Sequence, residues 1–236
     1  MKQLILFIEK SKFIASILRF IYRNTILKYK LYKQNKNFLK YSKETLLQAN
    51  KGFEELGIQY WLEFGTLLGA IRDKDFIKHD LDIDLGLFLE DYSDEIKIVL
   101  ESYGFKKIRD ISIDDGNYGF EESYMYKNIV VDLFYFTKNK NIMYSHVFKN
   151  EESKSWHKTI VDNGGLIVRE MIFPFNGFEE IDFLNIKYPV PKEAHKHLKS
   201  FYGENYMIKD RSWNPFTMAT NVKTLNDKIG VVKNYE

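Results

Sequence analysis

The chain has 236 residues, with 35 Lys and Arg against 33 Asp and Glu, 44% hydrophobic residues, 16% aromatic residues and no cysteine. This apolar content can fill a sizeable core, which excludes a disordered chain. The absence of cysteine excludes a disulfide scaffold, a thiolate zinc site and a cysteine nucleophile, and we expect a cytoplasmic protein.

The charge is distributed unevenly along the chain. Residues 1–44 hold eleven Lys and Arg and two acidic residues, giving +9, whereas the remainder carries −7. Because nucleic-acid binding needs a basic face, the acidic body argues against a nucleic-acid partner.

Residues 1–40 are expected to form a basic amphipathic helical arm, with 41–236 as the catalytic domain. Ile14, Ile17, Leu18 and Ile21 recur at helical spacing, and no apolar run is long enough for a signal peptide or a membrane span. Two interpretations of the arm stay open. It either makes peripheral contact with an anionic membrane, at the inner face of the cell membrane, or packs on its own domain.

The expected elements alternate between helices and strands. A helix over 42–56 should end at Gly57, and a strand over 59–64 should lead through Gly65 into a helical stretch, 66–72. The later expectations are a strand over 82–89, a helix over 91–103, weaker strands over 104–113 and 123–126, a strong strand over 129–136, short strand-like pieces within 137–190, and a helix over 192–202 that ends at Gly203.

The densest cluster of acidic residues lies in the strand expected over 82–89. Side chains alternate along a strand, so Asp80, Asp82 and Asp84 should share the face opposite Ile83 and Leu85. Carboxylates held this close repel one another, and a divalent cation relieves that repulsion. The competing interpretation is a solvated acidic edge strand.

Two further features favour the metal-site interpretation. Gly65 and Thr66 follow a strand and open a helix, where backbone N–H groups can bind phosphate. Asp132 interrupts the apolar run 129–136, where a carboxylate is unfavourable unless it is paired, hydrogen-bonded or bound to a metal.

Other acid-rich sites fit the sequence less well. An EF-hand loop beginning at Asp80 would need Gly at its sixth position and Glu at its twelfth, which hold Leu85 and Asp91. A glycosyltransferase Asp-x-Asp motif usually follows a βαβ nucleotide-binding half, and fewer than 80 residues precede this cluster.

The residues from Tyr60 to Arg72, then Phe76-Ile77, then Asp80 to Gly86 resemble the LicD/fukutin-related family. Val131 to Phe134 and Phe201 to Tyr206 resemble later blocks of that family, and the likeness covers roughly residues 45–210. Lys78-His79 departs from the Pro-Trp found in many members.

The resemblance implies an α+β fold of the nucleotidyltransferase superfamily, a small mixed β-sheet flanked by helices. It also implies metal-dependent transfer of a phospho-alcohol, such as phosphocholine or phosphoribitol, from a CDP-activated donor to a hydroxyl of a surface or lipid-linked glycan. Asp82 and Asp84 would hold Mg²⁺ or Mn²⁺, and Asp132 would complete the metal site or accept the acceptor's proton. Gly65, Thr66 and Arg72 would contact the donor phosphates, with Glu63 and Asp80 supporting them.

Two alternative functions remain at this point. The same fold could carry out nucleotidyl transfer, moving NMP to the acceptor and releasing pyrophosphate. Alternatively, the protein could be a non-catalytic scaffold of a polysaccharide assembly complex at the membrane surface, with its acidic residues merely solvated.

Overall fold

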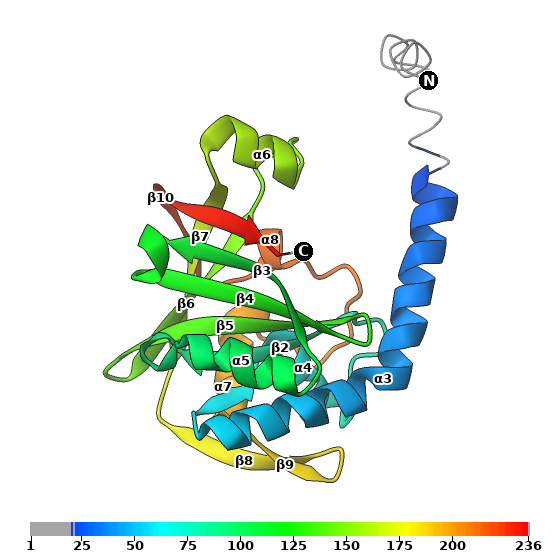
Figure 1. Cartoon of the computed structure of the whole chain (residues 1–236), viewed down its shortest axis with the longest axis vertical. Coiled ribbons are helices and arrows are strands. Elements are labelled where there is room, and N and C mark those ends of the chain that lie inside the picture. Colours follow the sequence, from blue (N-terminus) through cyan, green and yellow to red (C-terminus); the bar gives the residue numbers. More distant parts are fainter. Residues whose placement is uncertain (1–19, 21, 236) are drawn as a thin grey trace.

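The structure, a computed structural model, describes Phe20 and residues 22–235. Its largest element is an eight-stranded sheet in the order β1-β2-β5-β4-β3-β10-β7-β6 (Figure 1). The strands are β1 (Tyr60–Leu62), β2 (Asp82–Phe88), β3 (Lys106–Ile113), β4 (Gly119–Tyr126), β5 (Ile129–Asn139), β6 (Ile142–Lys149), β7 (Leu166–Pro174) and β10 (Val222–Asn234). β2 and β5 run parallel, and the other pairs of this sheet are antiparallel.

The α+β class and the mixed sheet are therefore confirmed, since β2 and β5 run parallel, but the expected small size is wrong, because the sheet has eight strands and is mostly antiparallel. It also closes on itself. β10 pairs with β7 through Val222–Gly230 and with β3 through Val231–Asn234, while the far end of β5 pairs with β6. This closure leaves β1, beside β2, as the free end of the strand order.

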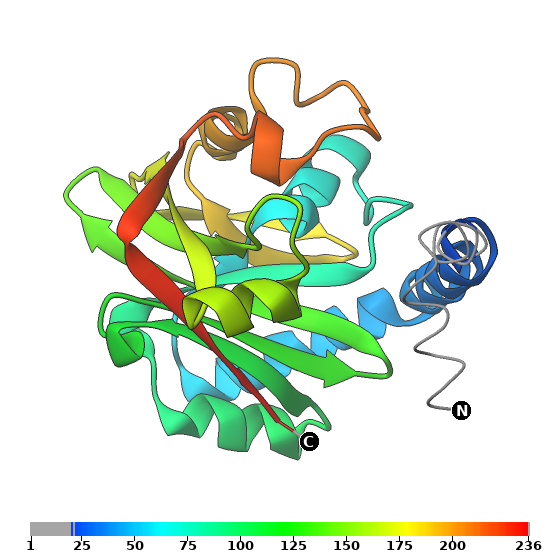
Figure 2. The same cartoon turned by 90° about the horizontal axis from the view of Figure 1, so that it is seen from above.

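Helices cover both faces of the sheet. Figure 2 shows α3 and α5 on one face, and α4, α7 and α8 on the other. The helices are η1 (Tyr22–Ile26), α3 (Leu27–Leu56), α4 (Phe64–Leu68), η2 (Gly69–Asp73), η3 (Leu89–Asp91), α5 (Asp94–Ser102), η4 (Asp114–Gly116), α6 (Trp156–Asn163), α7 (Ala194–Tyr202) and α8 (Pro215–Met218), and a separate hairpin comprises β8 (Phe178–Phe183) and β9 (Ile186–Pro191).

The long helix α3 ends where the sequence predicts, at Gly57, whose left-handed φ of 65° suits glycine. Its expected start at residue 42 is wrong, because the helix already begins at Leu27. The expected domain boundary between residues 40 and 41 falls inside this continuous helix. The helical stripe of Ile14, Ile17, Leu18 and Ile21 lies outside the described residues.

Alternation along β2 and β5 assigns their side chains to two different cores. Ile83, Leu85 and Leu133 face the core formed with α3 and α5. Phe88 and Phe134 face a second core, to which α7 contributes Phe201. Because side chains two residues apart share a face, Asp84 and Asp132 lie on the side of α4 and α7.

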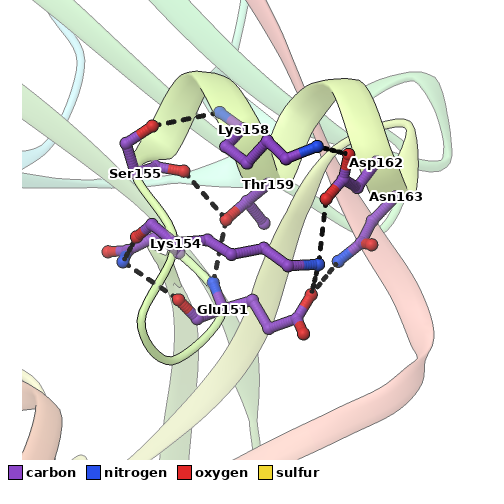
Figure 3. Close-up of polar contacts among 8 residues, drawn as sticks. Glu151, Lys154, Ser155, Lys158, Thr159, Asp162 and Asn163 are labelled. Carbon is purple, nitrogen blue, oxygen red and sulfur yellow. Dashed lines mark hydrogen bonds and ion pairs between the residues drawn. The ribbon is translucent and has the colours of Figure 1, made fainter. Parts of the chain in front are cut away.

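The connection between β6 and β7 contains α6, a helix within a stretch where only short strand-like pieces and loops were expected. The Lys154 ammonium bridges Glu151 at 2.6 Å and Asp162 at 3.0 Å, and Ser155 caps the helix by accepting from the Lys158 N–H (Figure 3). These contacts join both ends of α6 to the loop before it. The helix is thereby held as one unit beside the sheet.

No helix in the described part of the chain is long and apolar enough to cross a membrane.

Candidate active site

Three carboxylates converge where the two parallel strands lie side by side. Asp82 and Asp84 come from β2 and Asp132 from β5, and Asp84 stands directly opposite Asp132 in the strand register. One carboxylate oxygen of each lies within 4.8 Å of the others. Asp80 precedes β2 and lies beside the same group. The predicted sharing of one face is thus confirmed for Asp82 and Asp84.

Burial and mutual repulsion shape the electrostatics of this acidic centre. Burial, followed by the charges of Asp82, Asp80 and Asp132, holds the pKa of Asp84 well above its ordinary value. Burial and the Asp82 carboxylate raise the pKa of Asp80 to about 7, and burial raises the pKa of Asp132 to about 6. Oxygen ligands that repel one another at this spacing fit a hard divalent cation, which favours their ionised forms.

The turn that opens α4 fixes the central carboxylate. The Gly65 N–H donates to Asp84 Oδ2 at 2.9 Å, and the Asp84 N–H donates to Thr66 Oγ1 at 2.9 Å. Thr66 is 1% exposed, so its hydroxyl faces the backbone of β2. A Cβ at Gly65 would lie only 2.8 Å from Asp80 Oδ2, which explains why a glycine occupies this position.

Glu63 lies behind this turn and is completely buried. Its carboxylate accepts hydrogen bonds from Trp61 Nε1 at 2.7 Å and from the Phe64 N–H, and it contacts His197 Nε2 at 2.7 Å. Phe64 adopts a φ of 40°, an unfavourable left-handed conformation for a bulky residue. Glu63 therefore holds a strained turn in place and has no surface open to a donor.

A cavity of about 860 Å³ opens in front of the acidic centre. Gly65, Asp80 and Asp84 line one side of it, and the aromatic rings of Tyr202 and Trp213 stand 4.4 Å apart in its wall.

The same cavity contains a basic wall. Arg72, Lys209 and Arg211 all line it. Arg72 Nε and Lys209 Nζ both pair with the Asp73 carboxylate, at 3.0 and 3.1 Å, and these two ion pairs lower the pKa of Asp73 against the effect of burial. A ligand in this cavity meets carboxylates on one side and cations on another.

Sequence reasoning missed a second group of residues next to Asp132. Cross-strand register places Ser123 beside Asp132, and Arg109 beside Ser123. Ser123 Oγ donates to Asp132 Oδ1, while Arg109 Nη2 reaches Ser123 Oγ at 2.8 Å and Glu121 Oε1 at 3.2 Å. Burial, together with the charge of Asp132, raises the pKa of Glu121 to about 8. The adjacent Glu121 and Glu122, both amid aromatic residues, are the local signal that could have revealed this group.

α6 borders this second group. The Arg109 guanidinium lies 5.2 Å from the centre of the Trp156 ring, at the start of α6, and 3.6 Å from Asp132 Oδ1.

The fold and site together define an α+β domain in which a cluster of three carboxylates lies beside a cavity with basic and aromatic walls. The chain belongs to the LicD/FKTN/FKRP family, because the sequence model described as "LicD/FKTN/FKRP, nucleotidyltransferase domain" matches residues 57–193.

The chain is similar to curated proteins of that family. It is 29% identical over 198 residues to "Ribitol-5-phosphate transferase FKTN" of Mus musculus, covering 79% of this chain and 37% of that protein. It is 35% identical over 97 residues to "Ribitol 5-phosphate transferase FKRP" of Homo sapiens, covering 38% of this chain and 19% of that protein. The chain therefore spans little more than a third of the FKTN relative and about a fifth of the FKRP relative.

Proposed function

We propose that the protein is a metal-dependent transferase that moves a phospho-alcohol group from a CDP-linked donor to a hydroxyl of a surface or lipid-linked glycan. The observation that carries this proposal is the convergence of Asp82, Asp84 and Asp132 beside a cavity with a basic wall. The names of the FKTN and FKRP relatives support phosphoribitol as the kind of group transferred.

The cavity suits the diphosphate of such a donor. Phosphoryl transfer depends mainly on positioning and on neutralising charge, and Arg72, Lys209 and Arg211 provide cations on the wall. Asp82 and Asp84 would hold Mg²⁺ or Mn²⁺, which would neutralise the diphosphate and the departing nucleotide when bound, and Asp132 beside them would then act as the base. The Gly65 N–H keeps Asp84 aimed at that position.

In the proposed reaction, the acceptor hydroxyl oxygen bonds to the phosphorus that carries the alcohol. The bond from that phosphorus to the bridging oxygen breaks, and CMP leaves with that oxygen and the electron pair. The hydroxyl proton passes to Asp132 Oδ2, because Ser123 already occupies Oδ1 of the same carboxylate. The Arg109 side chain beside Asp132 limits the build-up of negative charge there.

A thermal-shift panel tests donor and metal together. We expect the melting temperature to rise with CDP-linked donors only when Mg²⁺ or Mn²⁺ is present, because a ligand that binds the folded state stabilises it. Asp82→Asn and Asp84→Asn should abolish both the shift and turnover. Asp182→Asn, at an exposed site on β8, is the matched control and should behave as wild type.

Product mass separates the alternatives. A gain of one phospho-alcohol on the acceptor supports the proposal, whereas a gain of one nucleoside monophosphate shows nucleotidyl transfer. A chain that binds neither donor nor metal would be consistent with the scaffold role and would reject the transferase.

A further inference from the structure

The first part of α3 projects beside the body of the protein. Figures 1 and 2 both show this segment standing clear of the sheet. Residues 28–34 are all exposed, and burial of the helix begins only at Phe38. A helix that buries so little of its surface exposes groups that contribute nothing to the core.

One side of α3 is nevertheless anchored to the body. The Asn35 amide donates to the backbone carbonyls of Lys78 at 2.8 Å and Asp80 at 3.1 Å. Phe38 is fully buried and packs edge-on against Phe76 at 5.3 Å. The helix is thus attached directly to the turn that leads into the acidic centre, and its opposite side remains free.

That free side, the outer face of α3, combines cations with apolar groups. It consists of Tyr29, Tyr32, Lys33, Lys36, Leu39 and Lys40, all exposed and spaced three or four residues apart along each row. Tyr29 and Tyr32 are each 63% exposed, and Leu39 is 53% exposed. Apolar side chains that gather on one exposed face, rimmed by charged residues, are typical of an interaction surface.

The charge of this segment is one-sided. No Asp or Glu occurs between Lys10 and Lys43 in the sequence. Lys33, Lys36 and Lys40 form no ion pair with any residue that the structure describes. The outer face therefore offers a concentrated positive charge to a partner.

We propose that the outer face of α3 docks on an anionic lipid bilayer. Lysines attract acidic headgroups, and tyrosine and leucine side chains enter the interfacial region. Like charges on the two copies would disfavour pairing of this face with itself. A free phosphate would bind the lysines but leave the exposed Leu39 side chain uncovered, whereas a lipid surface covers it. The proposal goes beyond the transferase function. Docking would place the Asp80 turn, and the acidic centre behind it, close to membrane-borne acceptors.

Sedimentation of the full chain with lipid vesicles tests the proposal. We expect binding to vesicles that contain phosphatidylglycerol, little binding to pure phosphatidylcholine vesicles, and loss of binding at high salt. The triple variant Lys33→Glu, Lys36→Glu, Lys40→Glu should bind on the order of 100-fold more weakly, because each basic residue near such a surface contributes about fivefold. Tyr29→Ser with Tyr32→Ser should also weaken binding.

The matched control reverses three exposed lysines elsewhere on the body, through Lys106→Glu, Lys192→Glu and Lys223→Glu. It carries the same net charge as the triple variant and should bind like wild type. Three results would each overturn the proposal. They are an equal loss of vesicle binding in both variants, unchanged vesicle binding after reversal of the outer-face lysines, and tighter binding to an oligonucleotide than to vesicles. A shift from dimer to monomer in the triple variant would also overturn it. Vesicle binding needs no turnover, so this result is independent of the transferase assay.

Discussion

Replacing Gly65 by alanine tests the geometry of the acidic centre with the smallest possible change. Gly65 lies in α4 with an ordinary backbone conformation, so alanine adds no backbone strain. The new Cβ would stand 2.8 Å from Asp80 Oδ2 and 3.1 Å from Asp84 Oδ2. Ordinary contacts of a Cβ begin at 3.4 Å, so the two carboxylates must retreat by roughly 0.6 and 0.3 Å.

A displacement of this size matters because functional groups must be held within about 0.5 Å, and an error of 1 Å can lower a rate about 100-fold. We therefore expect Gly65→Ala to lower kcat by about 10- to 100-fold and to weaken Mn²⁺ binding, measured by steady-state turnover and by metal titration. Stability should change little, because alanine favours the helix.

Gly52→Ala provides the matched control. Gly52 lies inside α3, where a new Cβ would meet the flexible Leu100 side chain at 3.1 Å and no carboxylate. This variant should retain normal turnover and metal affinity. Wild-type kcat and Mn²⁺ affinity in Gly65→Ala would refute the argument that close contact at this glycine positions the carboxylates.

Three further predictions concern buried polar groups. His197→Ala removes the partner of the buried Glu63 carboxylate, so the unfolding free energy measured in urea should fall by about 1–3 kcal/mol. His197→Gln should recover part of this loss. Unchanged stability in His197→Ala would show that His197 does not stabilise Glu63. Burial lowers the pKa of His146 from 6.5 to about 4. Between these two pH values the unfolded chain takes up a proton at His146 that the folded chain does not. The unfolding free energy should therefore fall by up to about 3 kcal/mol as the pH is lowered from 6.5 to 4. Urea unfolding at both ends of this pH range should show a smaller loss in His146→Gln, and an identical loss would reject the assignment. Lys107→Met leaves the buried Glu122 carboxylate without its cation, so the unfolding free energy should fall by about 3–5 kcal/mol. Adding Glu122→Gln should recover most of this loss. Calorimetry that shows no recovery would exclude the ion pair as the cause.

Local patterns predicted the central part of the fold well. Alternation along β2 correctly separated Ile83 and Leu85 from Asp82 and Asp84, because a strand that is buried on one face repeats every two residues. Gly57 correctly marked the end of α3, since few other residues adopt its left-handed conformation without strain. The convergence of Asp132 with these acids was predicted through the family resemblance as well as through its unusual apolar surroundings.

The missed features depend on contacts between distant parts of the chain. β10 is largely exposed, and Asn226, Asp227 and Gly230 interrupt its β-branched residues, so pairing with β3 and β7 determines its conformation. Helices were expected on both sides of residue 41, but their union in one helix from Leu27 to Leu56 was not predicted, because residues 28–34 are all exposed and make no core contact that would mark it. Arg109 and Ser123 join the site through cross-strand register, which a single sequence does not reveal.

The closure of the sheet by β10 has a consequence for the order of folding. β10 follows every other strand of the sheet along the chain, and its partner β3 precedes it by almost half the sequence. During synthesis, β3 and β7 therefore each keep one unpaired edge until β10 emerges, and unpaired edges can form a sheet with other chains. Pairing over so long a separation is slow, because the intervening loop must first be ordered. The last step of folding is thus also the step during which the chain is most exposed to aggregation.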